Sequence, residues 1–338
     1  MKAVLWTRYG APEALRPAEL PLPVPRERDV LIRVHAATVT AGDCEMRSLR
    51  LPAFLGLPMR MYVGFRRPRR IRVLGQELAG MVESVGSAVH EFRPGDAVFG
   101  SPGMRLGAYA EQVRLSMDSE ETVLARKPAA ISFEEAAAST VGGLEALHFM
   151  RRAALSPGDA LLINGAGGSI GTFAIQLAKH HGAEVTAVDA AGKLDMLRQL
   201  GADHVVDYTR EDFSQSDMRY DAVLDMVGGT SFPRCMRALK ADGRYLMANP
   251  SLRNMLRGKL MTLFGGKRVI GGAGRQRIED LEYIARLLEE GTVRTVIDRR
   301  YPLERIVEAH RYAETGTKTG NIAITVRDAA ANTGFSSA

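Results

Sequence analysis

The fold of this chain is decided by the stretch "LLINGAGGSIGTFAIQLAK", residues 161–179. It begins with an apolar run that is typical of a buried strand, and a cluster of glycines follows at once. The next residues place Ile170, Ala174, Leu177 and Ala178 at helical spacing. A strand, a glycine-rich turn and a helix in this order predict a dinucleotide-binding turn.

The glycines of this turn depart from the usual spacing, because Ala166 stands where a strict G-x-G-x-x-G pattern has its first glycine. That position is needed only for a tight turn, which alanine accepts while its φ stays negative, and Gly165 adds backbone freedom. Gly168 would let the backbone approach a pyrophosphate, and Gly171 would let the helix pack close to the sheet. N–H groups at the helix start would face the phosphates. The predicted cofactor-binding residues of the turn are Ala166, Gly167, Gly168, Ser169, Ile170 and Gly171.

A second predicted part of this site is Asp189, which ends the next apolar run, "EVTAVD", 21 residues after Gly168. An acidic residue at this place would accept hydrogen bonds from the adenosine ribose hydroxyls. A carboxylate about 4 Å from a 2′-phosphate would cost roughly 4 kcal/mol at an effective dielectric near 20, which favours NAD over NADP. Lys193, at the start of the following helix, is either the compensating cation or a solvated surface lysine.

The turn belongs to a longer alternation of strands and helices that begins near residue 133. Repeated strand–helix–strand units predict a parallel sheet. Its strands are expected at 160–166, 184–189, 204–208, 220–228 and 243–249, and its helices at 170–181, 193–200 and 231–239. The preceding part is β-rich, with strands expected at 29–39 and 77–86, and after it come helices at 278–290 and 304–314 and a strand at 321–326. The small, polar tail from about residue 328 is expected to be disordered.

Composition limits the class of protein. A chain of 338 residues is expected to form two domains, and 46% hydrophobic with 25% charged residues is typical of a soluble globular protein. No apolar run is long enough to span a membrane, and the amino terminus lacks the core of a signal peptide, so a cytoplasmic location is expected. Cys44 and Cys235 show no metal-ligand spacing. The net charge of +6 comes mostly from scattered basic residues, so no nucleic-acid partner is expected.

The segment "GQELAGMVESVGSAV", residues 75–89, matches the zinc alcohol dehydrogenase signature G-H-E-x2-G-x5-G-x2-V, with Gln76 in the place of the histidine. Together with "RPGDAVFG", "GAYAEQV" and "LGADHVVDYTREDF", it resembles the medium-chain dehydrogenase/reductase superfamily over residues 1–326. Within that superfamily, "TAGDCEMR" and "GLEALHFM" are most similar to the zinc-independent, quinone oxidoreductase-like branch and its reticulon-4-interacting-protein-like group.

This resemblance implies an α/β fold with two domains. A GroES-like, β-rich catalytic domain would be built from residues 1–125 and the returning residues 274–338. A Rossmann domain with a doubly wound parallel sheet would occupy residues 126–273 and bind the cofactor. By the same resemblance the active cleft would lie between the domains, and the subunits would form a homodimer.

The chain departs from its zinc-dependent relatives at the metal ligands. In those relatives a catalytic zinc takes a cysteine, the histidine of G-H-E and a further cysteine or acid, and it polarises the substrate oxygen. Here the cysteine's place is taken by Thr40 and the histidine's by Gln76, and neither is a good zinc ligand. The cysteines of the structural zinc lobe are also missing between residues 95 and 115. We therefore expect no metal.

Without zinc, hydrogen-bond donors must stabilise the charge that develops on a substrate oxygen. The candidates are the Thr40 hydroxyl, which would also lie beside the cofactor, and the Gln76 amide. Asp43 and Glu77 align with acidic residues near the family's active site. They either transfer a proton or fix loops by capping backbone N–H groups. Tyr62 is a candidate to close the cleft or donate a proton, or it is simply packed.

Further cofactor contacts are carried over from the resemblance. Tyr208, after the third Rossmann strand, would lie near the adenosine 2′ position, as in NADP-binding members, and this opposes the inference from Asp189. Val227, Ala248 and Asn249 would lie beside the nicotinamide half. Glu145 replaces a threonine that is common near the nicotinamide phosphate.

The segment 50–72 resembles an insertion, with apolar residues followed by the arginine-rich run "FRRPRRIR". It is interpreted as a flap over the substrate cleft, as an arm that touches acidic lipid headgroups, or as a surface loop with solvated arginines, and the last is favoured. Its prolines and glycines argue against one continuous membrane-lying helix.

The sequence thus predicts a zinc-independent, NAD(P)(H)-dependent oxidoreductase that transfers hydride to a quinone or an α,β-unsaturated carbonyl. One alternative is a carbonyl reductase or alcohol dehydrogenase. Another is a non-catalytic protein that senses nucleotide occupancy.

Overall fold

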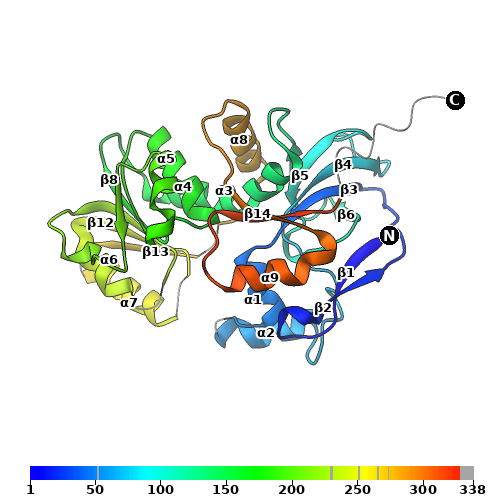
Figure 1. Cartoon of the computed structure of the whole chain (residues 1–338), viewed down its shortest axis with the longest axis horizontal. Helices are drawn as coiled ribbons and strands as arrows, with labels where there is room; N and C mark the ends of the chain where they lie inside the picture. Colours follow the sequence, from blue (N-terminus) through cyan, green and yellow to red (C-terminus); the bar gives the residue numbers. More distant parts are fainter. Residues whose placement is uncertain (52, 229–230, 250–251, 265, 273, 328–338) are drawn as a thin grey trace. The chain divides into compact units, whose positions relative to one another are not determined.

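A computed structural model of the chain describes residues 1–51, 53–228, 231–249, 252–264, 266–272 and 274–327 (Figure 1). The chain divides into two compact units. The first comprises Met1–Val141, Gln276–Glu289 and Thr295–Ala338, and the second comprises Gly142–Arg275 and Glu290–Arg294. The sequence predicted changes of domain after residues 125 and 273, whereas the first change in the structure falls within helix α3 (Phe133–Ala153). The tail predicted to be disordered lies outside the described residues.

The second unit contains a parallel sheet, in which the described residues form six strands in the order β10-β9-β8-β11-β12-β13. Numbered along the chain, this order is 3-2-1-4-5-6, the doubly wound order of dinucleotide-binding domains, so the predicted fold class is confirmed. Successive strands are added on one side of β8 up to β10 and on its other side from β11 onward, so the strand order reverses between β8 and β11, where Asn164 pairs with Asp225. The strands are β8 (Ala160–Asn164), β9 (Glu184–Asp189), β10 (His204–Asp207), β11 (Tyr220–Asp225), β12 (Leu239–Met247) and β13 (Arg268–Gly271).

Helices connect these strands, and the predicted ones form with small shifts at their ends. They are α4 (Ser169–His180), α5 (Leu194–Gln199), α6 (Phe232–Ala238) and α7 (Leu252–Phe264), of which α7 was not predicted. Helix α4 packs on β8 and β9, and every residue from Gly171 to Ala178 is buried. Its approach to the sheet depends on Gly171, because a Cβ there would lie 2.4 Å from the carbonyl oxygen of Ala166.

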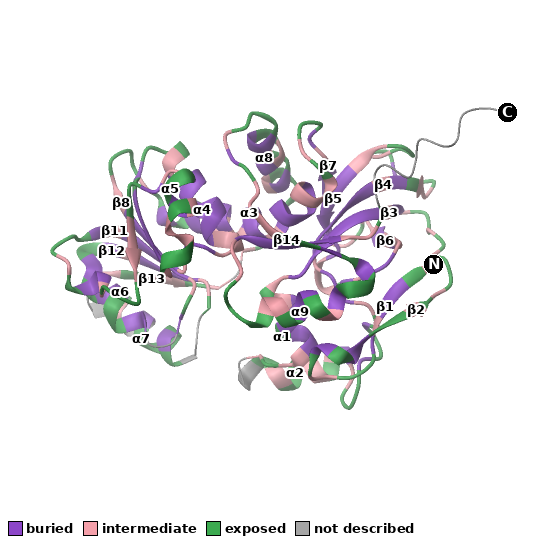
Figure 2. Cartoon of the chain, in the orientation of Figure 1, coloured by how far each residue is buried: buried purple, intermediate pink, exposed green. Residues whose placement is uncertain are grey.

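The first unit is built on a mostly antiparallel sheet, in which the described strands follow the path β14-β15-β3-β4-β5-β7 and β6 pairs with β3. Buried residues run through β3 and β4, drawn purple in Figure 2. The strands are β3 (Asp29–Thr38), β4 (Leu78–Val85), β5 (Ala97–Ser101), β6 (Gln112–Ser116), β7 (Val123–Arg126), β14 (Ile297–Pro302) and β15 (Asn321–Thr325), and β1 (Lys2–Trp6) pairs separately with β2 (Leu15–Glu19).

Two glycines of the signature at residues 75–89 are required by strand packing. A Cβ at Gly80 would lie 2.1 Å from the carbonyl oxygen of Arg33, and one at Gly86 would lie 1.9 Å from that of Arg26. No real Cβ tolerates such contacts, so these positions let neighbouring backbone segments approach closely. This part of the signature therefore reports on packing rather than on chemistry.

The helices of the first unit are α1 (Ala41–Ser48), α2 (Ala53–Val63), α8 (Ile278–Glu289) and α9 (Ile306–Glu314), together with the start of α3. Helices α8 and α9 form close to their predicted ranges. Helix α2 occupies part of the segment 50–72, where no helix was predicted, and it contains Pro58. Throughout the described residues, every helix is too short or too polar to cross a membrane.

The contact at Gly171 gives a prediction about stability. Gly171→Ala forces the backbone of α4 away from Ala166, and overpacking of this kind costs about 1–3 kcal/mol of unfolding free energy. Gly168→Ala is the matched control, because its Cβ would meet only the Gly165 carbonyl oxygen, at 3.8 Å. Urea denaturation should show a lower midpoint for Gly171→Ala alone; equal midpoints for the two variants would show that the close approach is not needed.

Candidate active site

The glycine-rich turn follows β8 directly and is held against β9. The N–H groups of Gly165 and Ala166 both donate to the carbonyl oxygen of Val188, at 2.9 and 3.1 Å. Gly165 takes the left-handed conformation, with φ +83°, whereas Ala166 is buried and is not among the residues with positive φ. The tight turn is therefore made by Gly165, and alanine fits the next position as predicted.

The start of α4 is open where a phosphate would be expected. Gly168 is the N-cap residue, and no side chain caps the helix there. Since the first N–H groups of a helix lack partners within it, an uncapped start offers donors to an anion. A Cβ at Gly168 would have no contact closer than 3.8 Å, so the space beside its Cα is empty of protein. The residues at this turn fit a dinucleotide phosphate.

The carboxylate of Asp189 is engaged inside the turn. One oxygen accepts from the Gly167 N–H at 2.7 Å and the other from the Ala190 N–H at 2.8 Å. Lys193 Nζ lies 3.2 Å from the second oxygen, and both side chains are mostly buried. Asp189 thus positions the glycine turn, and contact with a ribose stays a prediction. Tyr208, also predicted here, donates its N–H to the Asp189 carbonyl oxygen and is 58% exposed.

A second buried carboxylate, Asp225, organises the loop after β11. Its donors come from several elements and include the Asn164 amide at 2.9 Å and the Tyr245 hydroxyl at 2.5 Å. The remaining donors are the Val227 and Gly228 N–H groups and the Ser231 hydroxyl. This network fixes the loop at the point where the sheet changes direction, which is where α/β sheets bind ligands.

Three residues predicted beside the nicotinamide lie around this loop. Val227 is 61% exposed, although its N–H is held by Asp225. The Ala248 N–H donates to the Asp225 carbonyl oxygen at 3.0 Å, and the Asn249 amide donates to that of Met226 at 2.6 Å. The loops after β11 and β12 are therefore joined, and their role toward a cofactor stays a prediction.

Glu145 is tied to the backbone of a neighbouring loop. Its carboxylate accepts from the N–H of Gly274 at 3.3 Å, and burial raises the pKa of this carboxyl. The Gly274 N–H shares the negative charge of the carboxylate, and this reduces the repulsion that an acid would exert on a nearby phosphate.

In the first unit, Thr40 and Asp43 form a capping box at the start of α1. The Thr40 hydroxyl accepts from the Asp43 N–H at 3.0 Å, and the Asp43 carboxylate accepts from the Thr40 N–H at 3.0 Å. The same carboxylate lies 2.7 Å from the Thr40 hydroxyl. When Asp43 is ionised, it is the acceptor for the hydroxyl proton, and this commits Thr40 to donating within the protein.

Behind Asp43 lies a buried chain of hydrogen bonds. The carboxylate also accepts from the Gly75 N–H at 3.1 Å and from the Tyr109 hydroxyl. His310 Nε2 lies 3.2 Å from that hydroxyl, and Arg47 Nε donates to His310 Nδ1 at 3.3 Å. Burial and then Arg47 lower the pKa of His310 to about 3, so its ring is neutral and Nε2 carries the proton. Each donor in this series of hydrogen bonds therefore points toward Asp43.

Gln76 lies against α1 and keeps donors available. A Cβ at Gly42 would lie 2.8 Å from Gln76 Nε2, so the amide packs directly on the helix start. The Thr40 hydroxyl lies 3.2 Å from Gln76 Oε1. Within the described part of the chain, Gln76 Nε2 has no acceptor. Of the two predicted donors, the amide of Gln76 is thus the one that is free to bind a substrate oxygen.

Glu77 and Tyr62 have mainly structural contacts. The buried carboxylate of Glu77, just before β4, accepts from the Thr38 hydroxyl and from the Val141 N–H, the latter at 2.6 Å, so it links β3 to α3. Tyr62 packs against the core of the first unit, with the Arg70 guanidinium 4.3 Å from the centre of its ring. These contacts favour the interpretation that both residues hold local structure, and proton transfer by either one stays a prediction.

Comparison with known proteins places this geometry in a family. Residues 26–128 match the family described as alcohol dehydrogenase GroES-like domain, and residues 200–324 match the family described as zinc-binding dehydrogenase. The chain is 31% identical to 2-methylene-furan-3-one reductase of Solanum lycopersicum, over 96% of this chain and 79% of that protein. It is 32% identical to the mitochondrial NAD(P)H oxidoreductase RTN4IP1 of Mus musculus, over 96% and 89%. The structure of the Coxiella burnetii quinone oxidoreductase superposes with a TM-score of 0.85 at 31% identity, covering 97% and 99%.

The chain is a medium-chain dehydrogenase/reductase. It belongs to the quinone oxidoreductase-like branch of that superfamily. Both predictions from the sequence are confirmed.

The metal-ligand positions of this medium-chain dehydrogenase/reductase are occupied by hydrogen-bonding side chains. Thr40 and Gln76, which replace the cysteine and the histidine, lie 3.2 Å apart and contact each other. No three histidine, cysteine or acidic side chains gather in a metal-binding group among the residues that the structure describes. Burial raises the pKa of the Cys44 thiol to about 12, and its Sγ lies 3.4 Å from His310 Nδ1. This cysteine is a poor thiolate ligand.

Several residues of the site were not predicted from the sequence. Asn164 and Asp225 end the parallel strands β8 and β11, as Asp189 ends β9, so the rule that ligands bind at the carboxyl ends of strands could have identified them. Tyr109 and His310 carry no such signal. They are 201 residues apart and meet only through the packing of the first unit.

The burial of Asp43 predicts a pH dependence of stability. Burial raises the pKa of its carboxyl from 3.8 to about 6, despite hydrogen bonds that favour the ionised form. Between these values the folded chain binds more protons than the unfolded chain, so Asp43 makes the unfolding free energy fall as pH rises from about 4 to about 6. Across this window Asp43 lowers the unfolding free energy by about 3 kcal/mol, and its effect is constant at higher pH.

Urea denaturation across pH 4–7 should show this contribution as a difference between the wild type and Asp43→Asn. Asp195→Asn, which changes an exposed carboxylate, is the control. The prediction fails if the wild type and Asp43→Asn differ by the same amount at pH 4 and at pH 7.

Proposed function

We propose that the chain is an NAD(P)H-dependent oxidoreductase that reduces a quinone or an α,β-unsaturated carbonyl compound. The observation that carries this proposal is the uncapped start of α4 beside Gly168, at the switch point of a doubly wound sheet. The names of its relatives support the substrate class, since a methylene-furanone and a quinone both contain a carbonyl conjugated with a carbon–carbon double bond.

The cofactor would be held by residues of the second unit. The residues from Ala166 to Gly171 would receive the pyrophosphate on backbone N–H groups, with Asp189, Lys193 and Tyr208 on the adenosine side. Val227, Ala248 and Asn249 would support the nicotinamide half. The bound nicotinamide supplies the hydride. The chain's own contribution is to orient this ring and to keep the turn rigid through the hydrogen bond from Gly167 to Asp189.

The substrate oxygen would be bound by a neutral donor in the first unit. Gln76 Nε2 has no acceptor among the described residues, whereas the Thr40 hydroxyl is directed to Asp43. A preorganised amide N–H stabilises a developing oxyanion without a proton of its own being transferred. Asp43, Tyr109 and His310 would act as positioning residues, because their series of hydrogen bonds fixes Thr40 at the start of α1, the part of the helix on which Gln76 packs.

We further propose that this oxidoreductase works without zinc. The support is the donor set, because a hydroxyl and an amide stand where zinc-dependent relatives have a thiolate and an imidazole. A cytoplasmic location and a homodimeric state also stay predictions. The RTN4IP1 relative is named as mitochondrial.

A turnover assay tests the activity. The purified chain should oxidise NADPH or NADH in the presence of at least one member of a panel of quinones and enones, followed at the nicotinamide absorbance. Gly168→Ala should reduce kcat/KM by roughly tenfold or more, because its methyl group fills the space proposed for the pyrophosphate. Gly192→Ala is the matched control, since its Cβ would meet no atom within 4 Å.

The outcomes separate the alternatives. Tight cofactor binding without turnover of any acceptor would favour a nucleotide sensor, and turnover of simple ketones or alcohols alone would favour a carbonyl reductase or alcohol dehydrogenase. Elemental analysis that finds one zinc per chain, with activity lost on chelation, would contradict the zinc-free proposal.

The ion pair at Asp189 gives a prediction about the choice of cofactor. Because Lys193 neutralises Asp189, the pair as a whole does not repel a 2′-phosphate, and we expect NADPH to bind at least as tightly as NADH. Lys193→Met leaves the carboxylate unpaired and should weaken NADPH binding by roughly tenfold, with little change for NADH. Fluorescence titration of both reduced cofactors measures this.

Lys179→Met serves as the control, since Lys179 pairs with Asp203 instead. An equal loss of affinity for both cofactors in Lys193→Met would contradict the proposed role. Asp189 itself is a poorer target, because its carboxylate also holds two backbone N–H groups.

A further inference from the structure

The segment between Met46 and Gln76 is strongly basic. It contains eight arginines and no aspartate or glutamate. Six of these arginines lie within residues 60–72, which we call the arginine segment: Arg60, Arg66, Arg67, Arg69, Arg70 and Arg72. Within the described ranges, none of the six forms an ion pair with an acid; Arg60 and Arg70 lie over the rings of Tyr9 and Tyr62. The positive charge of the arginine segment is therefore uncompensated.

Helix α2, which leads into the arginine segment, is apolar on its outer side as well as on its inner side. Val63 is buried in the core of the first unit, and Met59 and Tyr62 pack against that core. Leu57 and Met61, with Phe65 just after the helix, are spaced by four residues and are 58%, 74% and 63% exposed. We call these three residues the apolar stripe. In Figure 2, α2 is largely pink and green, which marks partial or full exposure.

The exposure of the apolar stripe needs a physical reason. A helix that is apolar all round is normally buried in a core or in lipid. Arg60 is the only charged residue of α2, so the polar face expected of a surface helix is missing. Large exposed apolar groups next to uncompensated charge indicate a partner that offers both hydrocarbon and negative charge.

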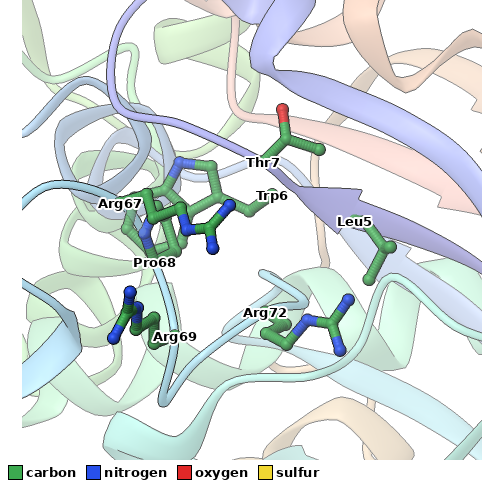
Figure 3. Close-up of a pocket in the computed structure, with 7 residues that line it drawn as sticks. All are labelled: Leu5, Trp6, Thr7, Arg67, Pro68, Arg69 and Arg72. Carbon is green, nitrogen blue, oxygen red and sulfur yellow. The ribbon is translucent and has the colours of Figure 1, made fainter.

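Three arginines of the segment surround a pocket of about 400 Å³ on the first unit. Figure 3 shows Arg67, Arg69 and Arg72 around this pocket, with Leu5 and Thr7 also lining it. Guanidinium groups that share a pocket repel one another, and a bound anion removes this repulsion. Arginine is also suited to phosphate, because its planar fork donates two parallel hydrogen bonds.

The backbone that carries these arginines is fixed. The N–H groups of Arg69 and Arg70 both donate to the Val63 carbonyl oxygen at 3.0 Å, at the end of α2. The Trp6 N–H donates to the Arg72 carbonyl oxygen at 2.7 Å, which ties the other end of the segment to β1. The arginine pocket is therefore preorganised, and its backbone is joined directly to the end of the helix that carries the apolar stripe.

We propose that α2 and the arginine segment form a docking surface for membranes that contain anionic phospholipid. The pocket at Arg67, Arg69 and Arg72 receives a lipid phosphate, and the apolar stripe enters the boundary between headgroups and acyl chains. Such interfacial binding combines buried apolar area with attraction to anionic lipid, and it needs no spanning helix. It is independent of the proposed catalytic function.

Other occupants fit this surface less well. A second copy of the chain, docked by the same face, would bring two uncompensated arginine segments together and repel. Nucleic acid would satisfy the arginines but would leave Leu57, Met61 and Phe65 without an apolar partner. An anionic bilayer surface offers phosphate groups to the arginine segment and hydrocarbon to the apolar stripe.

Flotation of the full chain with vesicles tests the proposal. We expect binding to phosphatidylcholine vesicles that contain about one third phosphatidylglycerol, and no binding to pure phosphatidylcholine. The triple variant Arg67→Gln, Arg69→Gln and Arg72→Gln should lower the partition coefficient by roughly a hundredfold, since each arginine near an anionic surface contributes roughly a factor of five. The double variant Leu57→Ser and Met61→Ser should lower it by roughly tenfold.

The matched control removes the same charge from exposed arginines elsewhere, with Arg105→Gln, Arg152→Gln and Arg277→Gln. It should bind vesicles nearly as well as the wild type, because the proposal depends on position and not on net charge. Thermal unfolding midpoints of all variants should match the wild type, since the substituted groups have no acidic partner in the described structure.

Three results would overturn the proposal. The first is equal loss of binding in the control and in the arginine variant, and the second is no binding of the wild type to anionic vesicles. The third is binding of a single-stranded oligonucleotide that depends on the same three arginines while vesicle binding does not. Because flotation needs neither cofactor nor substrate, failure here leaves the proposed function untouched, and failure of turnover leaves this proposal untouched.

Discussion

The second unit depends on the close approach of α4 to the glycine-rich turn that follows β8. Gly171 lets α4 lie against the Ala166 carbonyl, Gly165 reverses the chain with a positive φ, and Asp189 holds the Gly167 N–H from the next strand. A Cβ at Gly171, or loss of the Asp189 carboxylate, would displace the helix start. The same backbone that satisfies the packing of the sheet also leaves the start of α4 without a side-chain cap, so the proposed phosphate site follows from how the helix meets the sheet.

The sequence predicted those parts of the fold that a pattern within one short segment specifies. The run from β8 to β9 was predicted nearly residue by residue, because buried strands are uniformly apolar and α4 repeats apolar residues at helical spacing. Helix α1 was not predicted, since five of its eight residues are polar or glycine and only the capping box of Thr40 and Asp43 marks its start. Helix α2 was missed because Pro58 and two glycines in and after it suggested irregular chain.

The candidate site could be predicted where a motif gives both the type and the position of a residue. It could not be predicted where residues far apart in the sequence meet only in the folded chain. Thr40, Gln76 and Asp43 were identified through the family resemblance, and Thr40 does lie in contact with the other two. The support behind them, Tyr109 and His310, depends on α9 packing against the amino-terminal part of the unit, and no pattern near either residue indicates it. Asp189 was singled out from its place at the end of β9, but no sequence pattern indicated that its carboxylate accepts from the Gly167 N–H.

The two residues of the ion pair between Asp189 and Lys193 differ in their contacts with the main chain. The aspartate accepts two backbone N–H groups, whereas the lysine side chain makes no bond to the main chain among the contacts that the structure describes. Selection can therefore alter the charge of this turn at the lysine without disturbing its shape, while the aspartate is constrained. Under the role proposed for Lys193, coenzyme preference would change through a single codon, and the acidic position would persist through the change.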